Sequence, residues 1–198
     1  MVSRLWRSFS DTLYVASKGR LATLLLVLVT LINIFIFPWH KEIVFKLTGG
    51  ATPIDWKVFY TPHQFQSYIH ALGTEGRQHI VLFALTLDLL YAFLSALLIG
   101  LFLAALLREV FEETSPGMYL QLVPFMAFFF DVVENIGIVW ISLSYPLSQT
   151  MLETTTSLVR IASTGKWLFV ALSFASLLFC FLSTILFKLF VTPTKKKS

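Results

Sequence analysis

Four long apolar stretches, separated by more polar or irregular segments, dominate the pattern along the chain. Each is near or above the length of roughly 20 apolar residues with which a helix crosses a bilayer. The stretches that we assign as membrane spans are residues 21–38, 78–107, 119–144 and 167–191. The pattern therefore predicts an all-α fold, an integral membrane four-helix bundle that forms a single domain over residues 21–192.

Polar segments flank this domain at both ends. Residues 1–20 combine basic residues with apolar ones at roughly helical spacing. This pattern fits either a short amphipathic helix on anionic lipid headgroups or a partly ordered basic leader. The apolar run that follows is longer than the core of a usual signal peptide and lacks a small-x-small cleavage site after it, so we expect a retained span. Residues 193–198 form a basic tail.

The longest connection, residues 39–77, contains a helix start signal. In Thr61-Pro62-His63-Gln64 the threonine can cap a helix, proline suits the first helical position, and the glutamine completes a capping box. Apolar residues then recur on one face as far as Gly73, which should stop the helix. We predict a short helix over residues 62–72 that lies at the membrane interface or covers the bundle.

Composition supports the membrane assignment. Of the 198 residues, 57% are hydrophobic and only 13% are charged, and the mean hydropathy is +0.78, as expected for an integral membrane protein. The single cysteine, Cys180, excludes an intramolecular disulfide and a dithiol relay. The net charge of +4 arises largely at the two ends and, without any nucleic-acid-binding signature, indicates contact with lipid. Four spans leave both termini on one side, and the positive-inside rule places them in the cytoplasm.

Two acids and an amide interrupt the third span, namely Asp131, Glu134 and Asn135. An ionised Asp at the centre of a spanning helix costs on the order of 3 kcal/mol, so such a residue normally faces protein or water and has a function. In the second span Asp88 shares a helical stripe with Arg77 and Tyr91. Small residues form a ridge beside this stripe, which would let another helix approach closely.

We expect these side chains to form one site, because two helices joined by a short turn are usually antiparallel neighbours. The carboxyl groups of Asp88, Asp131 and Glu134 would then meet near the midplane of the membrane. The candidate ligand-binding residues are Asp88, Tyr91, Asp131, Glu134, Asn135 and Arg77.

The charge state of this site follows from what is predicted to surround it. Residues 145–166 are predicted to be a second connection, so no Lys, Arg or His is expected at the depth of the acids, and a structural salt bridge is not available. Three ionised carboxylates in a low dielectric repel one another, so some must be protonated, share a proton or hold a cation. The alternative is a set of neutral acids that hydrogen-bond to Tyr91, Asn135, Thr86 or the backbone.

Three classes of function remain open at this stage. In the first, the site binds a cation, a proton or a polar amphiphile for binding or transport. Asp88, Asp131 and Glu134 would then be the ligands if the cation is divalent, such as calcium or magnesium, and a homo-oligomer is expected because four spans are few for a transporter. In the second, a membrane-embedded enzyme modifies a lipid or isoprenoid, with Asp88 and Glu134 as catalytic acid and base. In the third, the chain is an assembly subunit whose acids meet a basic residue of a membrane partner.

The span count, the long first loop and the acid in the second span resemble the EXPERA group of membrane proteins, which includes the sigma-2 receptor and sterol isomerase. No motif is shared around Asp131 and Glu134, so no activity or residue is carried over. Lys195 and Lys196 have the spacing of a dilysine retrieval signal. This predicts the endoplasmic reticulum membrane if the chain is eukaryotic, whereas in a bacterium the same lysines would anchor it in the cytoplasmic membrane.

Overall fold

The computed structural model describes residues 2–190, with side chains for residues 5–189. Within that range every regular element is a helix, and four helical segments are long and apolar enough to cross a membrane. These segments are Arg20–Thr48, Pro62–Val110, Pro116–Ser144 and Gln149–Leu189. The all-α class and the presence of four helices able to span a membrane are therefore confirmed, whereas the predicted basic tail, 193–198, lies outside the described residues.

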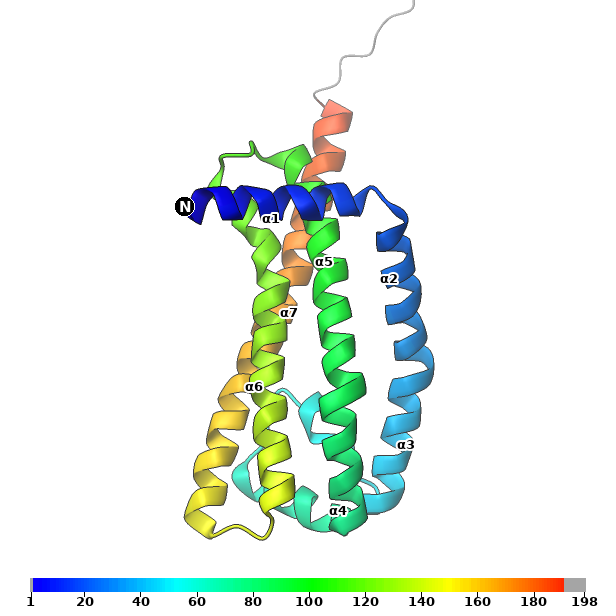
Figure 1. The fold of residues 1–198 in the computed structure, drawn as a ribbon, viewed down its shortest axis with the longest axis vertical. Helices are drawn as coiled ribbons and strands as arrows, with labels where there is room; N and C mark the ends of the chain where they lie inside the picture. The colour runs from blue at the N-terminus through cyan, green and yellow to red at the C-terminus, as the bar shows by residue number, and fades with distance from the viewer. Residues whose placement is uncertain (1, 191–198) are drawn as a thin grey trace, which may run out of the picture.

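The spans run side by side, and a further helix lies across one end of them (Figure 1). The elements in chain order are α1 (Val2–Ser17), α2 (Arg20–Leu31), η1 (Ile32–Ile36), α3 (Phe37–Thr48), η2 (Ile54–Trp56), α4 (Pro62–Phe83), η3 (Ala84–Asp88), α5 (Leu89–Val110), η4 (Pro116–Leu122), α6 (Val123–Ser144) and α7 (Gln149–Phe190). The crossing helix is α1, which is joined to α5 by an ion pair between Asp11 and Arg108.

The first span is longer than predicted. Pro38 was expected to end it, but the helix continues to Thr48. Just before Pro38 the chain forms one π-helical turn, Ile32–Ile36, and the proline then occupies the first turn of α3. The π-helical turn changes the backbone hydrogen bonding directly before Pro38, which lacks an N–H, so the helix passes the proline without ending.

The second connection is much shorter than the predicted 145–166. Helix α7 begins at Gln149 and runs without interruption to Phe190. Several of its Ser and Thr side chains bond back to the carbonyl four residues earlier, as Thr154 does to Thr150 and Thr164 to Arg160. These bonds satisfy hydroxyl groups within the helix, so a polar stretch that we assigned to the second connection stays helical.

The predicted helix start in the long first connection is present. Thr61 and Gln64 form a reciprocal capping box at the beginning of α4, with the backbone N–H of Thr61 donating to Gln64 Oε1 over 2.8 Å. Gly73 has a φ of 62°, which breaks the helical geometry at the predicted position. The part of α4 before Gly73 thus departs in direction from the part that enters the second span.

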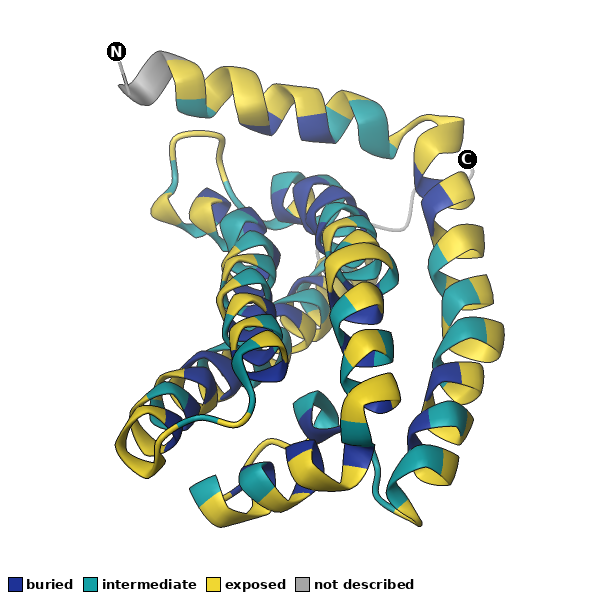
Figure 2. Cartoon of the chain, turned by 60° about the horizontal axis from the view of Figure 1, so that its bottom comes forward, coloured by how far each residue is buried: buried dark blue, intermediate teal, exposed yellow. Residues whose placement is uncertain are grey.

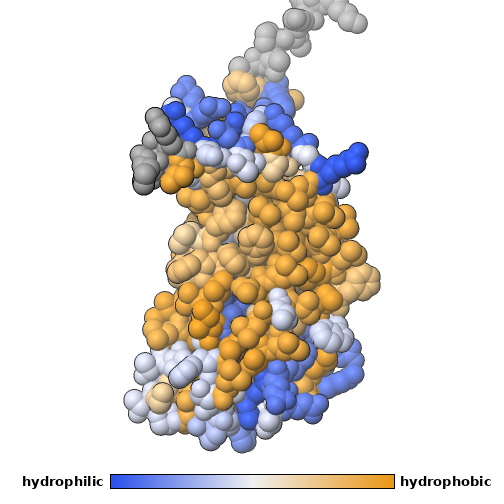
Figure 3. All heavy atoms as spheres, in the orientation of Figure 1, coloured by the Kyte–Doolittle hydropathy of each residue, from blue (hydrophilic) through white to orange (hydrophobic). Residues whose placement is uncertain are grey.

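The outer surface has the character of a membrane protein. A broad apolar band separates two polar ends (Figure 3), and exposed residues occupy the outward faces of the helices while buried ones face inward (Figure 2). Large apolar side chains in mid-span are strongly exposed, including Phe35 at 63% and Ile136 at 60%. Soluble proteins rarely expose a continuous apolar surface of this size to water. The band is therefore typical of a surface that contacts lipid.

Candidate functional site

The third span places its acids on the inner face of α6. Glu134 and Asn135 follow Asp131 by three and four residues, which puts all three on the same side of the helix. All three are buried, and Glu134 is completely so. Burial of three polar side chains on one face requires partners on the neighbouring elements.

Asn135 connects the second and third spans. Its Nδ2 donates to Asp88 Oδ2 over 2.8 Å and to Asp131 Oδ2 over 3.2 Å. Asp88 is itself buried and is the last residue of the π-helical turn η3, Ala84–Asp88. Such turns occur often at functional sites because they redirect a side chain locally.

Lys166 on α7 contradicts the expectation that no basic side chain reaches this depth. Its Nζ lies 3.1 Å from Asp131 Oδ1 and also forms an ion pair with Glu134 Oε2, and the lysine side chain is only 12% exposed. A salt bridge is therefore available inside the bundle. The prediction was wrong because residues 145–166 were assigned to a connection between spans, whereas α7 carries Lys166 inward along an unbroken helix.

The segment between α3 and α4 supplies a further carboxyl group that sequence reasoning missed. In Figure 1 this segment, cyan, folds back between the helices, and its Ile54 and Tyr60 join a buried apolar cluster with Ile138 and Val159. Lys166 Nζ donates to the main-chain oxygen of Asp55 over 3.4 Å. The sequence signal was an acid between two large apolar residues, Ile54 and Trp56, in the long first connection.

Asp55 lies in an environment that disfavours its charge. Burial first, and then the nearby Asp88, raise the pKa of Asp55 to about 8 even though Lys166 acts in the opposite direction. A carboxyl group of this kind exchanges its proton close to neutral pH.

Two candidate residues are not part of the cluster. Tyr91 accepts a hydrogen bond from Asn33 Nδ2 over 3.2 Å, which links the first and second spans. Arg77 bonds to Thr74 Oγ1 and places its guanidinium 4.8 Å from the ring centre of Tyr145. Thr86, suggested as a partner of the acids, instead donates to Leu82 of its own helix.

The remaining space inside the site is small. A cavity of about 10 Å³ lies beside the carboxyl cluster, which is room for about one water molecule. It is lined by His40, Ile54, Asp55, Tyr68, Ile80, Phe83, Ala84, Asp88, Asn135 and Ile138. A proton or one water fits there, whereas a lipid headgroup does not fit this conformation.

The donor set is also a poor one for a metal. Among the described residues no group of three or more His, Cys, Asp or Glu side chains has an arrangement that would hold a metal ion. The ammonium of Lys166 already lies between Asp131 and Glu134, two of the residues suggested as ligands for a divalent cation.

Comparison of the chain with protein-family models, curated proteins and solved structures gives no match. Fold and site together define a class only, that of a helical membrane protein with a carboxyl–lysine cluster between its spans. Its function has to be inferred from the chemistry of that cluster.

Proposed function

We propose that this is a proton-binding membrane protein whose buried carboxyl cluster takes up and releases protons in the course of binding or transport. The observation that carries this proposal is an imbalance of charge. Four carboxyl groups, those of Asp55, Asp88, Asp131 and Glu134, gather around one ammonium group, that of Lys166.

The imbalance matters because Asp88, Asp131 and Glu134 are buried. Each unpaired ion in a protein interior costs several kcal/mol, so four carboxylates around one lysine would be strongly unfavourable. Protonation removes this cost directly. The argument does not depend on a metal ion, for which the described residues offer no suitable group.

We infer different roles for the four acids from their contacts. Asp131 and Glu134 pair with Lys166, so we take them as the ionised part of the cluster. Asp88 Oδ2 accepts a hydrogen bond from the amide of Asn135, and Asp88 lines the small cavity together with Asp55. The exchangeable proton therefore resides on Asp88 or Asp55, with Asn135 as the donor that holds Asp88 in place.

The orientation predicted from charge completes the proposal. With both termini in the cytoplasm, the segment that carries Asp55 lies on the external or lumenal side, and the helix that precedes Gly73 lies near that interface. Protons would then reach the cluster from that side. The same arrangement fits a bacterial cytoplasmic membrane and an endoplasmic reticulum membrane.

Infrared titration of the purified protein in lipid nanodiscs tests this proposal, because a protonated buried carboxyl has a C=O band separate from that of a carboxylate. We expect such a band at neutral pH that disappears on alkaline titration and is diminished in Asp88→Asn and Asp55→Asn. Glu112→Gln, which alters an exposed acid in the connection after α5, is the control and should leave the band unchanged. Absence of the band at neutral pH in the parent protein would refute the proposal.

A further inference from the structure

Two histidines lie next to the carboxyl cluster but are not part of it. His40 on α3 and His79 on α4 face each other, with His40 Nδ1 3.1 Å from His79 Nε2. This distance is that of a hydrogen bond in which one ring donates and the other accepts. The pair thus joins the first and second spans through groups that can pass a proton.

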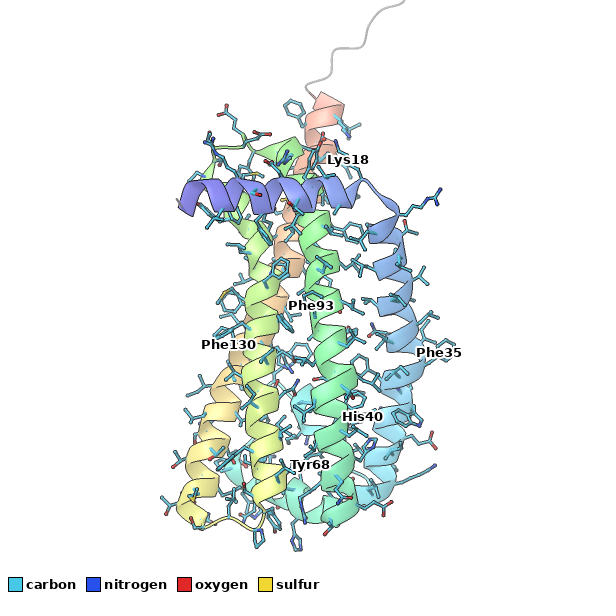
Figure 4. All side chains as sticks on the ribbon, viewed as in Figure 1. Lys18, Phe35, His40, Tyr68, Phe93 and Phe130 are labelled. Atoms are coloured by element: carbon cyan, nitrogen blue, oxygen red, sulfur yellow. The ribbon has the colours of Figure 1, made fainter. Side chains whose placement is uncertain are left out.

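The two rings differ in how far they are exposed at the surface of the protein. His40 is 1% exposed, whereas His79 is partly exposed and has the exposed Trp39 beside it, at 5.7 Å between ring centres. His79 therefore lies on the outer side of the pair. Figure 4 places His40 between α3 and the neighbouring second span.

The buried end of the pair leads to the carboxyl groups. His40 lines the same small cavity as Asp55, Asp88 and Asn135, so one water molecule in that cavity would connect its ring to the two acids. Phe83 stacks on His40 with 3.5 Å between ring centres, which fixes the plane of the imidazole. The titratable groups that line this cavity together with His40 are Asp55 from η2, Tyr68 from α4 and Asp88 from η3.

We propose that His79 and His40 form the proton relay that connects the surface to the Asp55–Asp88 pair, an inference that rests on the proton-binding function proposed above. His79 accepts a proton at Nδ1 and releases the one on Nε2 to Nδ1 of His40. His40 then releases its Nε2 proton through the cavity to a carboxylate. No electrons move, one N–H bond forms as another breaks at each ring, and release by the reverse steps restores both tautomers.

A pH jump followed by time-resolved infrared detection of the carboxyl band tests the relay. His79→Asn keeps a polar side chain but cannot pass a proton, and His63→Asn, at an exposed position in α4, is the matched control. We expect His79→Asn to slow protonation on the order of 100-fold, as for loss of one positioned proton-transfer group, with the same final amplitude. Imidazole added to the buffer should restore the rate, because it replaces the missing ring.

The outcomes separate the two proposals. If the parent band responds to pH but His79→Asn protonates at the parent rate, the relay is wrong and the proton-binding site stands. A slower rate that imidazole does not restore also overturns the relay, since it indicates a structural effect of the substitution. If the parent protein shows no titrating carboxyl band, the proposed function fails and the relay fails with it.

Discussion

Lys166 on α7 forms an ion pair with Glu134 on α6, whose side chain is completely buried. The same ammonium contacts Asp131 one turn earlier on α6 and the main-chain oxygen of Asp55. One side chain thereby ties the third span, the fourth span and the returning segment between α3 and α4 together. The stability of the bundle should depend on it.

Replacement of this lysine tests that dependence. Lys166→Met leaves two buried carboxyl groups without their cation, so we expect a loss of roughly 3–5 kcal/mol in the free energy of unfolding, measured by denaturation in detergent. The double variant Lys166→Met/Glu134→Gln should recover part of it, because one uncompensated charge is gone. Lys46→Met removes an exposed lysine that pairs with Glu42 and should have little effect. Equal losses at both lysines would contradict a buried ion pair.

The bridging amide gives a second prediction. Asn135→Ala removes hydrogen bonds to two acids, each worth about 1.5–3 kcal/mol if its acceptor is charged. We expect a loss of about 3 kcal/mol in thermal or chemical denaturation. Asn33→Ala removes the other interhelical amide, which bonds to Tyr91, and should cost about 0.6 kcal/mol, the average for polar contacts between spans. A larger loss at Asn33 than at Asn135 would argue against a network centred on Asn135.

Asp55 predicts how stability varies with pH. Its pKa is raised from 3.8 to about 8 in the folded protein, so between these values the folded state binds a proton that the unfolded state lacks. Its contribution to stability is therefore complete below about pH 4 and is lost as pH rises toward 8, at up to about 1.4 kcal/mol per pH unit. Asp55→Asn should flatten this decline in melting temperature, whereas Glu112→Gln should not. If the melting temperature of Asp55→Asn declines with pH as steeply as that of the parent protein, the carboxyl group of Asp55 is in water in the parent protein.

Close packing of α6 on α7 gives a further prediction. A Cβ at Gly165 would lie 2.7 Å from Phe130, and one at Gly137 would clash with Val159. Gly165→Ala and Gly137→Ala should each reduce stability by about 1–3 kcal/mol, as overpacking does. Gly19→Ala, where the nearest atom to a Cβ is a backbone oxygen at 3.5 Å, is the control. Stabilisation by Gly165→Ala or Gly137→Ala would show that α6 and α7 leave room for a Cβ at that position.

Labelling tests the proposed orientation. In a Cys180→Ser background, His63→Cys places the only thiol at an exposed position near the start of α4. A membrane-impermeant maleimide should label it in intact cells if the protein is in the cytoplasmic membrane. In microsomes it should label the thiol only after the vesicles are permeabilised, because the lumenal face is then accessible. Labelling from the cytoplasmic side alone would reverse the orientation, so that protons reach the cluster from the cytoplasm.

Local signals in the sequence were sufficient for several elements. The four apolar stretches predicted the spans because an apolar run of that length has few other stable environments. The capping box at Thr61 and the helix break at Gly73 were also predictable, since both depend on residues close together in the chain. Burial of Asp88, Asp131 and Glu134 followed from the cost of exposing a charge to lipid.

Long-range packing decided the rest. The sequence determined which segments enter the membrane and which acids must turn inward, because those choices depend on local hydropathy and helical spacing. Only the tertiary structure decided that Lys166 neutralises two of those acids, that Asp55 folds back beside them, and that His40 meets His79. These partners lie in segments far apart in sequence, and no periodicity along the chain specifies which helix faces will meet.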